Sequence, residues 1–151
     1  MIPALFLKYL LLPKNKVKDF SPAGKIIGID YGKKSIGIAI SDPNRIIAFP
    51  RVVLKGKNCA ENLAKIREFI AREKIEEIVV GWPLSMQGEV TTQTKETQQF
   101  IEVLVATFGL PVAKMDERLT TIQAKKSKGD DAVAAQILLQ TYLDMVKSRH
   151  D

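Results

Sequence analysis

Apolar and polar positions divide the chain into three short strands followed by alternating helices and strands. Residues 25–31, 35–42 and 45–54 are apolar runs of strand length separated by short turns, which predicts three consecutive antiparallel strands. Pro50 lies within the third run. Because proline cannot donate a hydrogen bond to a neighbouring strand, that run is expected at an edge of the sheet.

The rest of the chain changes to helical spacing. Residues 60–73, 91–108 and 131–145 carry apolar side chains at three- and four-residue intervals, which predicts three helices. Short strand-like segments at 75–83 and 110–121 lie between these helices. The order βββαβαβα therefore predicts an α/β fold with a five-stranded mixed sheet and helices on both faces.

The chain has 151 residues, which fits one domain of ordinary size. Residues 25–147 hold every predicted element and are interpreted as that domain. Residues 1–24 are interpreted as an N-terminal extension of unknown role, and residues 148–151 as a tail. The apolar stretch MIPALFLKYLLLP is shorter than the about 20 residues that a membrane span needs, so no membrane association is expected.

The formal charge of +6 is compatible with a polyanionic partner such as nucleic acid. A basic surface without such a partner is equally compatible with it. The chain has one cysteine, Cys59, and one histidine, His150. This composition excludes an internal disulfide, argues against a zinc site or a Cys–His nucleophile pair, and fits a reducing cytoplasm.

Acidic residues follow several of the predicted core elements. Asp30 ends the first strand, Asp116 and Glu117 end the last one, and Asp130 and Asp131 open the final helix. A carboxylate buried alone would lose its hydration at high cost. Because sites in such sheets form at the carboxyl ends of the parallel strands, these acids are expected to converge at one edge.

Converging carboxylates repel one another unless cations lie between them. Mg²⁺ or Mn²⁺ would remove that repulsion, and two such ions can hold a scissile phosphate and activate a water without His or Cys. Simpler interpretations exist: Asp130 or Asp131 could cap the helix, and Glu117 could pair with Arg118. Neighbours on a strand point to opposite faces, so the sequence does not choose between Asp116 and Glu117.

Four segments resemble the YqgF family and occur in the family's order: GIDYGKKSIGIAISD, IVVGWPLSMQGE, MDERLTT and DAVAAQILLQTYLD. Members of that family have the ribonuclease H-like fold and are described as candidate Holliday junction resolvases and as pre-16S rRNA nucleases. The resemblance implies a metal-dependent nuclease with two Mg²⁺ or Mn²⁺ ions. It favours pre-rRNA over branched DNA as the substrate, and it implies a cytoplasmic monomer or homodimer.

The resemblance also implies roles for individual residues. It implies four catalytic acids: Asp30, Asp116, Glu117 and Asp131. Three of them, Asp30, Asp116 and Asp131, are the implied metal ligands. The rest of the MDERLTT motif implies substrate binding by Arg118, Thr120 and Thr121. Five lysines are also expected to bind substrate, because the predicted topology places them near the acidic edge, where they would contact phosphates: Lys33, Lys34, Lys125, Lys126 and Lys128. The basic segment IQAKKSKGD is much shorter than the family's usual one but keeps its lysines.

Two other classes of protein compete with the nuclease. Actin-like and sugar-kinase ATPases use a similar aspartate–glycine strand turn, but they need two such domains in a longer chain. A nucleic-acid-binding module without catalysis would not need the full set of acids. Trp82 could stack on an unpaired base, although packing beneath its loop is the favoured interpretation.

Overall fold

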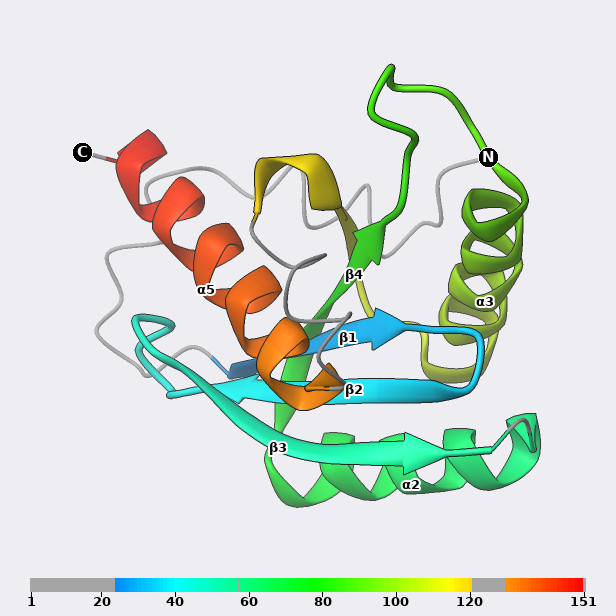
Figure 1. The fold of residues 1–151 in the computed structure, drawn as a ribbon. Helices are drawn as coiled ribbons and strands as arrows, with labels where there is room; N and C mark the ends of the chain where they lie inside the picture. Colours follow the sequence, from blue (N-terminus) through cyan, green and yellow to red (C-terminus); the bar gives the residue numbers. More distant parts are fainter. Residues whose placement is uncertain (1–23, 57, 121–129, 151) are drawn as a thin grey trace.

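The computed structural model describes residues 24–56, 58–120 and 130–150 and contains a five-stranded sheet of order β3-β2-β1-β4-β5 (Figure 1). The strands are β1 (Lys25–Tyr31), β2 (Ser35–Ser41), β3 (Ala48–Lys55), β4 (Ile75–Trp82) and β5 (Val112–Asp116). Strand β1 pairs antiparallel with β2 and parallel with β4, and β4 pairs parallel with β5. The predicted mixed sheet is therefore confirmed, and the carboxyl ends of β1, β4 and β5 share one edge.

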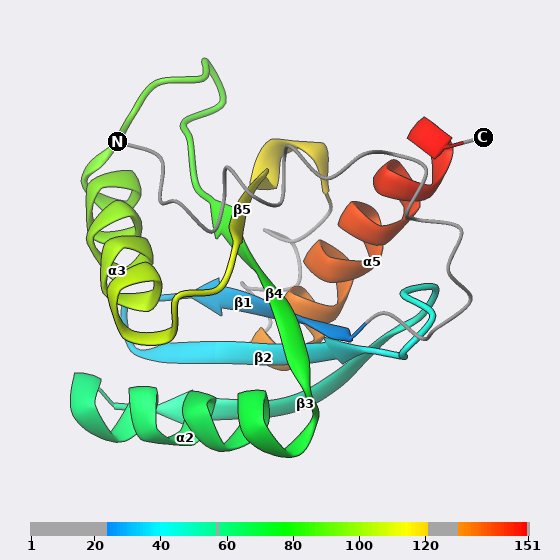
Figure 2. The ribbon, with the colours of Figure 1, turned by 180° about the vertical axis from the view of Figure 1, so that it is seen from behind.

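Helices cover both faces of the sheet, as predicted. Helices α2 (Cys59–Arg72) and α3 (Thr92–Phe108) lie on one face, and α5 (Asp131–His150) lies on the other (Figures 1 and 2). Each face has its own apolar core, because successive strand side chains alternate between the two faces. Ile27, Ile29 and Val80 belong to the core under α2 and α3, and Ile26, Val79 and Met115 to the core under α5.

Local capping explains where α2 and α3 begin and where α3 ends. The Asn58 side chain accepts a hydrogen bond from the Glu61 amide at the start of α2, and Thr91 forms a capping box with Thr94 at the start of α3. Helix α3 ends at Gly109, whose φ of +65° is a conformation that glycine adopts without strain.

Helix α5 packs unusually close to the centre of the sheet, and two glycines permit this approach. A Cβ atom on Gly28 of β1 would lie 2.8 Å from the Cβ atom of Leu139. A Cβ atom on Gly37 of β2 would lie only 2.0 Å from the backbone oxygen of Asp131. The first turn of α5 therefore rests directly on β2 because residue 37 has no side chain.

Three element boundaries differ from those expected by three residues or more. The third strand begins at Ala48 rather than Arg45, because the Asp42 carboxylate accepts hydrogen bonds from the amides of Ile46 and Ile47 and holds them in a turn. Arg45 in that turn has a φ of +57°. The position of β3 at the edge of the sheet agrees with the expectation from its proline.

The other two boundaries lie near the candidate site and at the end of the chain. Strand β5 ends at Asp116, and Glu117–Leu119 form a short 3₁₀ helix, η2, instead of continuing the strand. The Asp116 side chain accepts a hydrogen bond from the Arg118 amide, which caps this turn. The last helix continues past Met145 to His150. Within the described ranges, no helix is both long and apolar enough to cross a membrane.

The close approach of α5 to Gly37 predicts that adding one methyl group at this position lowers the stability of the protein. Gly37→Ala should force α5 away from β2, because the obstructing atom belongs to the backbone and cannot rotate aside. We expect a loss of roughly 1–3 kcal/mol in the free energy of unfolding, as overpacked cores show, measured by urea denaturation. A Gly37→Ala variant as stable as the wild type would contradict this packing.

Candidate active site

Asp30 lies at the centre of the candidate site, near the end of the central strand β1. Its exposed fraction is only 2%. Alternation along β1 puts Asp30 on the same face as Ile26 and Gly28, which is the face that α5 covers. Asp30 is therefore a buried carboxylate next to the apolar core under α5, a face on which Glu77 is also buried and accepts a hydrogen bond from Tyr142.

Glycines flank Asp30 on both neighbouring strands. Gly37 of β2 is its direct partner in the antiparallel ladder. On the other side, Ile29 is paired with Val80, so the next residues along the two parallel strands are Asp30 and Gly81. The two positions beside Asp30 therefore carry no side chains, and each is filled by another acidic segment.

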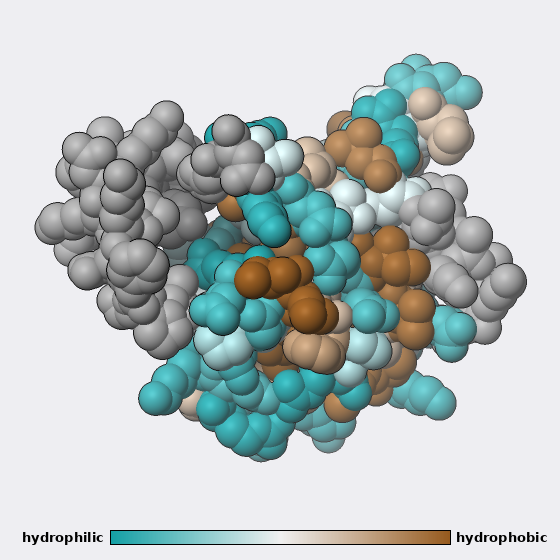
Figure 3. All heavy atoms as spheres, turned by 90° about the vertical axis from the view of Figure 1, so that its left-hand side faces the viewer, coloured by the Kyte–Doolittle hydropathy of each residue, from teal (hydrophilic) through white to brown (hydrophobic). Residues whose placement is uncertain are grey.

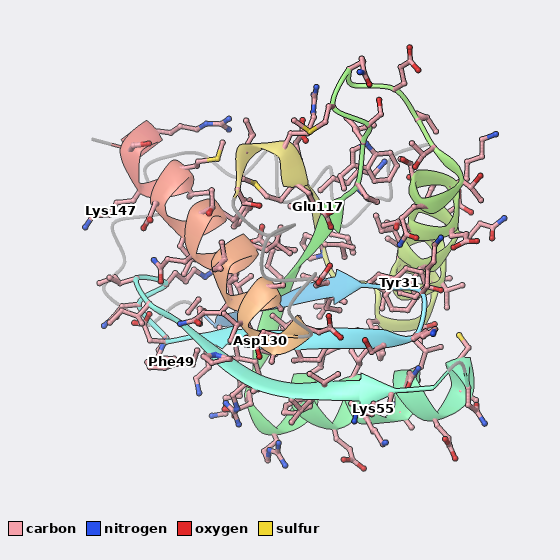
Figure 4. All side chains as sticks on the ribbon, viewed as in Figure 1. Tyr31, Phe49, Lys55, Glu117, Asp130 and Lys147 are labelled. Atoms are coloured by element: carbon pink, nitrogen blue, oxygen red, sulfur yellow. The ribbon has the colours of Figure 1, made fainter. Side chains whose placement is uncertain are left out.

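Glu117 fills the space above Gly81. A Cβ atom on Gly81 would lie 2.6 Å from Oε1 of Glu117, and Glu117 is only 3% exposed. Figure 4 labels Glu117 near the carboxyl end of β4. The η2 turn positions this residue, because the backbone nitrogen and the hydroxyl of Thr120 both donate hydrogen bonds to the Glu117 carbonyl oxygen, at 3.2 and 3.0 Å.

Asp131 fills the space above Gly37 with the first turn of α5. Its carboxylate atom Oδ2 accepts a hydrogen bond from the Ser35 hydroxyl, which fixes the side chain at the start of β2. Asp130 has a different role: it is exposed, and its carbonyl oxygen accepts the amide hydrogen bond of Ala134 at 2.8 Å. Asp130 thus lies immediately before α5 (Figure 4), and Asp131, the first residue of the helix, lies beside β2.

Asp116 is not directed toward the same face. It is paired across the sheet with Trp82, which packs against the core under α2 and α3. The Asp116 carboxylate accepts hydrogen bonds from Nε and Nη2 of Arg118, with distances of 2.8–3.1 Å. This guanidinium lowers the pKa of Asp116, and the carboxylate raises the pKa of Arg118. Asp116 and Arg118 therefore form a bidentate ion pair.

The chemistry of these donors fits a divalent cation, because carboxylate oxygens are the hard ligands that Mg²⁺ and Mn²⁺ prefer. The flanking glycines leave the two acidic segments that carry Glu117 and Asp131 room to approach Asp30. As the side chains stand, however, no three His, Cys, Asp or Glu residues in the described ranges are grouped closely enough to hold a metal ion. Asp131 is instead directed to Ser35.

The basic residues expected to contact the substrate have different positions. Lys33 and Lys34 are exposed on the β1–β2 turn, immediately after Asp30 and Tyr31. Arg118 is engaged by Asp116, and Thr120 supports Glu117. Four of the expected residues lie outside the described ranges: Thr121, Lys125, Lys126 and Lys128.

Trp82 packs rather than projecting into solvent. Its ring is partly buried against the core under α2 and α3, and the ammonium of Lys114 lies 4.0 Å from the ring centroid. This agrees with the favoured interpretation of Trp82 as a packing residue.

Three structural contributors to the site were not recognised in the sequence: Ser35, Gly37 and the η2 turn. The alternation in β2 contains the signal for two of them, because Ser35 and Gly37 fall on the same face as Asp30 once the hairpin register is known. The turn at η2 gives no apolar pattern and is visible only in the structure.

A mixed sheet of this order, with acids at the carboxyl edge of its parallel strands, is the ribonuclease H-like fold. The sequence profile of the family described as "RuvX: Holliday junction resolvase" matches residues 24–145. The chain belongs to the RuvX (YqgF) family.

Curated relatives match along nearly their whole length. A protein of Maridesulfovibrio salexigens is 37% identical over 131 residues, which cover 79% of this chain and 97% of the relative. A protein of Caldanaerobacter subterraneus is 36% identical over 137 residues, with 82% and 99% coverage. Both relatives carry the name "Putative pre-16S rRNA nuclease".

Solved structures of RuvC from Thermus thermophilus have the same fold. One, in complex with a Holliday junction substrate, has a TM-score of 0.54 and 18% identity, and the match covers 80% of this chain and 93% of RuvC. A second RuvC structure gives a TM-score of 0.53 at 14% identity. At this identity the likeness concerns the fold alone.

Proposed function

We propose that this protein is a metal-dependent endonuclease that hydrolyses phosphodiester bonds in pre-16S rRNA, near the 5′ end of the mature RNA. The observation that carries the proposal is the burial of Asp30 and Glu117, at 2% and 3% exposure, at neighbouring positions of one sheet edge. Two buried carboxylates in adjacent positions repel each other, and a divalent cation relieves that repulsion.

Glu117, rather than Asp116, is proposed as the metal-binding acid of the MDERLTT segment. Glu117 covers Gly81 on the face that Asp30 shares. Asp116 belongs to the other face and is engaged by the two nitrogens of Arg118. The proposed ligand set is therefore Asp30, Glu117 and Asp131, with Asp116 holding the turn that carries Glu117.

Each side chain has a distinct part in the proposed chemistry. Asp30 and Glu117 would hold Mg²⁺ or Mn²⁺, with Asp131 as the third carboxylate when it leaves Ser35. Bound ions of this kind stabilise charge on a scissile phosphate and lower the pKa of a water. Lys33 and Lys34 on the adjacent turn attract the phosphate backbone without reading its sequence.

The substrate is proposed from the relatives and from the charge of the chain. The relatives carry a pre-16S rRNA nuclease name, and the formal charge of +6 favours a polyanion. The activity belongs to the cytoplasm, which a chain with a single cysteine suits.

Resolution of branched DNA is the second candidate function. It is favoured by the family's description and by the fold shared with a RuvC bound to a Holliday junction. A resolvase makes two cuts and would therefore act as a homodimer, whereas cleavage of pre-rRNA requires only a monomer. Incubation with Mg²⁺ or Mn²⁺ and matched pre-16S rRNA, single-stranded RNA and four-way DNA junctions separates the two activities.

The choice between the adjacent acids predicts a difference between two isosteric variants. Glu117→Gln should abolish metal-dependent cleavage, because it removes a negative charge from the buried face. Asp116→Asn should retain measurable cleavage, because it weakens only the ion pair with Arg118 that supports the turn. Initial rates on the preferred nucleic acid check this, and complete inactivity of the Asp116 variant beside an active Glu117 variant would reverse the assignment.

Substitution of Asp30 distinguishes a metal-binding role of this carboxylate from a purely structural one. Asp30→Asn should abolish cleavage and lower the affinity for Mn²⁺, while stability without metal holds or rises because repulsion between carboxylates is relieved. Thermal unfolding with and without metal, together with a cleavage assay, measures both effects. The exposed acid Asp144 gives the matched control, Asp144→Asn. A destabilised Asp30→Asn variant that still cleaves at the wild-type rate would contradict the proposal.

A further inference from the structure

The segment that follows β4 folds into a hairpin. It comprises residues 83–90, is called the 83–90 hairpin below, and is closed by a bridge between Leu84 and Val90. Within it, the Ser85 amide donates to the Glu89 carbonyl at 3.0 Å, and the Gly88 amide donates to the Ser85 carbonyl at 2.8 Å. In Figure 1 this segment projects beyond the carboxyl end of β4, away from the body of the sheet.

The hairpin is anchored at its base and along one side. At its base, the Thr94 hydroxyl donates a hydrogen bond to the Pro83 carbonyl. Along its side, Gly88 lies against Arg118: a Cβ atom on Gly88 would be 3.0 Å from Nη1 of that guanidinium. The same guanidinium binds Asp116 through Nε and Nη2. Arg118 therefore connects the hairpin to the turn that carries Glu117.

Exposed apolar side chains gather around this connection. Met86, at the tip of the hairpin, is 74% exposed and is the most exposed large apolar side chain in the described ranges. Val90 of the hairpin is 58% exposed, and Leu119, next to Arg118, is 60% exposed. An exposed apolar patch of this kind is typical of a surface that binds another molecule.

We propose that the 83–90 hairpin is the specificity element of this enzyme, and that Met86 packs against an unpaired base of single-stranded RNA beside the cleaved phosphate. This proposal rests on the nuclease function proposed above. Gly81 of β4 lies beside Asp30, and Met86 follows it five residues later, so the hairpin leaves the sheet at the same edge as the carboxylates. A thioether on an aromatic ring gives a favourable contact, and only a base released from a duplex exposes its flat face.

The contact with Arg118 explains how the hairpin would keep a fixed position relative to the proposed catalytic acids. Two of the guanidinium nitrogens bind Asp116, and the third lies against Gly88, so one side chain positions both the hairpin and Glu117. Arg118 is thus a positioning residue in this proposal, in place of a direct phosphate ligand.

Binding to RNA without divalent metal isolates this role from catalysis. Fluorescence anisotropy in EDTA would compare a single-stranded RNA carrying 2-aminopurine with the same strand in a full duplex. Met86→Ala should weaken single-strand binding about three- to tenfold, consistent with sulfur–aromatic contacts, and leave duplex binding unchanged. Wild-type binding should also alter 2-aminopurine fluorescence, and Met86→Ala should reduce that change. Met86→Leu should retain part of the affinity.

The matched control is Ile47→Ala. Ile47 is 51% exposed and lies in the β2–β3 turn, at the opposite end of the sheet from Asp30. Figure 3 views the side that carries this turn, where a small apolar patch lies among hydrophilic residues. Ile47→Ala should change neither binding constant. Equal weakening by the Met86 and Ile47 variants, or no effect of Met86→Ala on single-strand binding, would overturn the proposal.

The outcomes also separate this inference from the proposed function. If the wild type binds single-stranded RNA through Met86 but cleaves no RNA with Mg²⁺ or Mn²⁺, the nuclease function fails and the binding surface stands. If it cleaves RNA and Met86→Ala changes neither selectivity nor affinity, only this inference fails. If the wild type binds duplex RNA more tightly than the single strand, the hairpin does not recognise unpaired bases.

Discussion

The site depends on the absence of side chains at two positions beside Asp30. Gly37 on one neighbouring strand admits the first turn of α5, and Gly81 on the other admits Glu117. Any side chain at either position would occupy the space of an acidic segment. Close packing, rather than attraction between like charges, therefore brings the carboxylates together, and the apolar cores on both faces of the sheet provide the free energy that holds them there.

The acids near this edge divide into two groups by the face of the sheet that they occupy. Asp30, Glu117 and Asp131 belong to the α5 face, whereas Asp116 pairs with Arg118 across from Trp82. The ion pair orders the turn that carries Glu117, and the same Arg118 contacts the 83–90 hairpin. One guanidinium thus contacts both the hairpin proposed to recognise the substrate and the turn that carries the proposed metal ligand Glu117.

Much of this arrangement could be predicted from the sequence. The features that could not be predicted depend on side-chain hydrogen bonds and on the exact ends of strands. Strand and helix periodicity predicted the order of elements and both covered faces, and Pro50 predicted the edge position of β3. The beginning of β3 was missed because the Asp42 side chain replaces ladder hydrogen bonds with a turn. The choice between Asp116 and Glu117 could not be made because it depends on where β5 ends and η2 begins, and a shift of one residue exchanges the faces.

The central claim is that Asp30 and Glu117 together hold a divalent cation. Crystals of the full chain soaked in Mn²⁺, with data collected at a wavelength where manganese scatters anomalously, test it most directly. The account predicts an anomalous peak within ligand distance, about 2.0–2.6 Å for such hard cations, of carboxylate oxygens from Asp30 and Glu117, with Asp116 still paired with Arg118. A peak bound by Asp116 in place of Glu117, or no peak at Asp30 under saturating Mn²⁺, would contradict it.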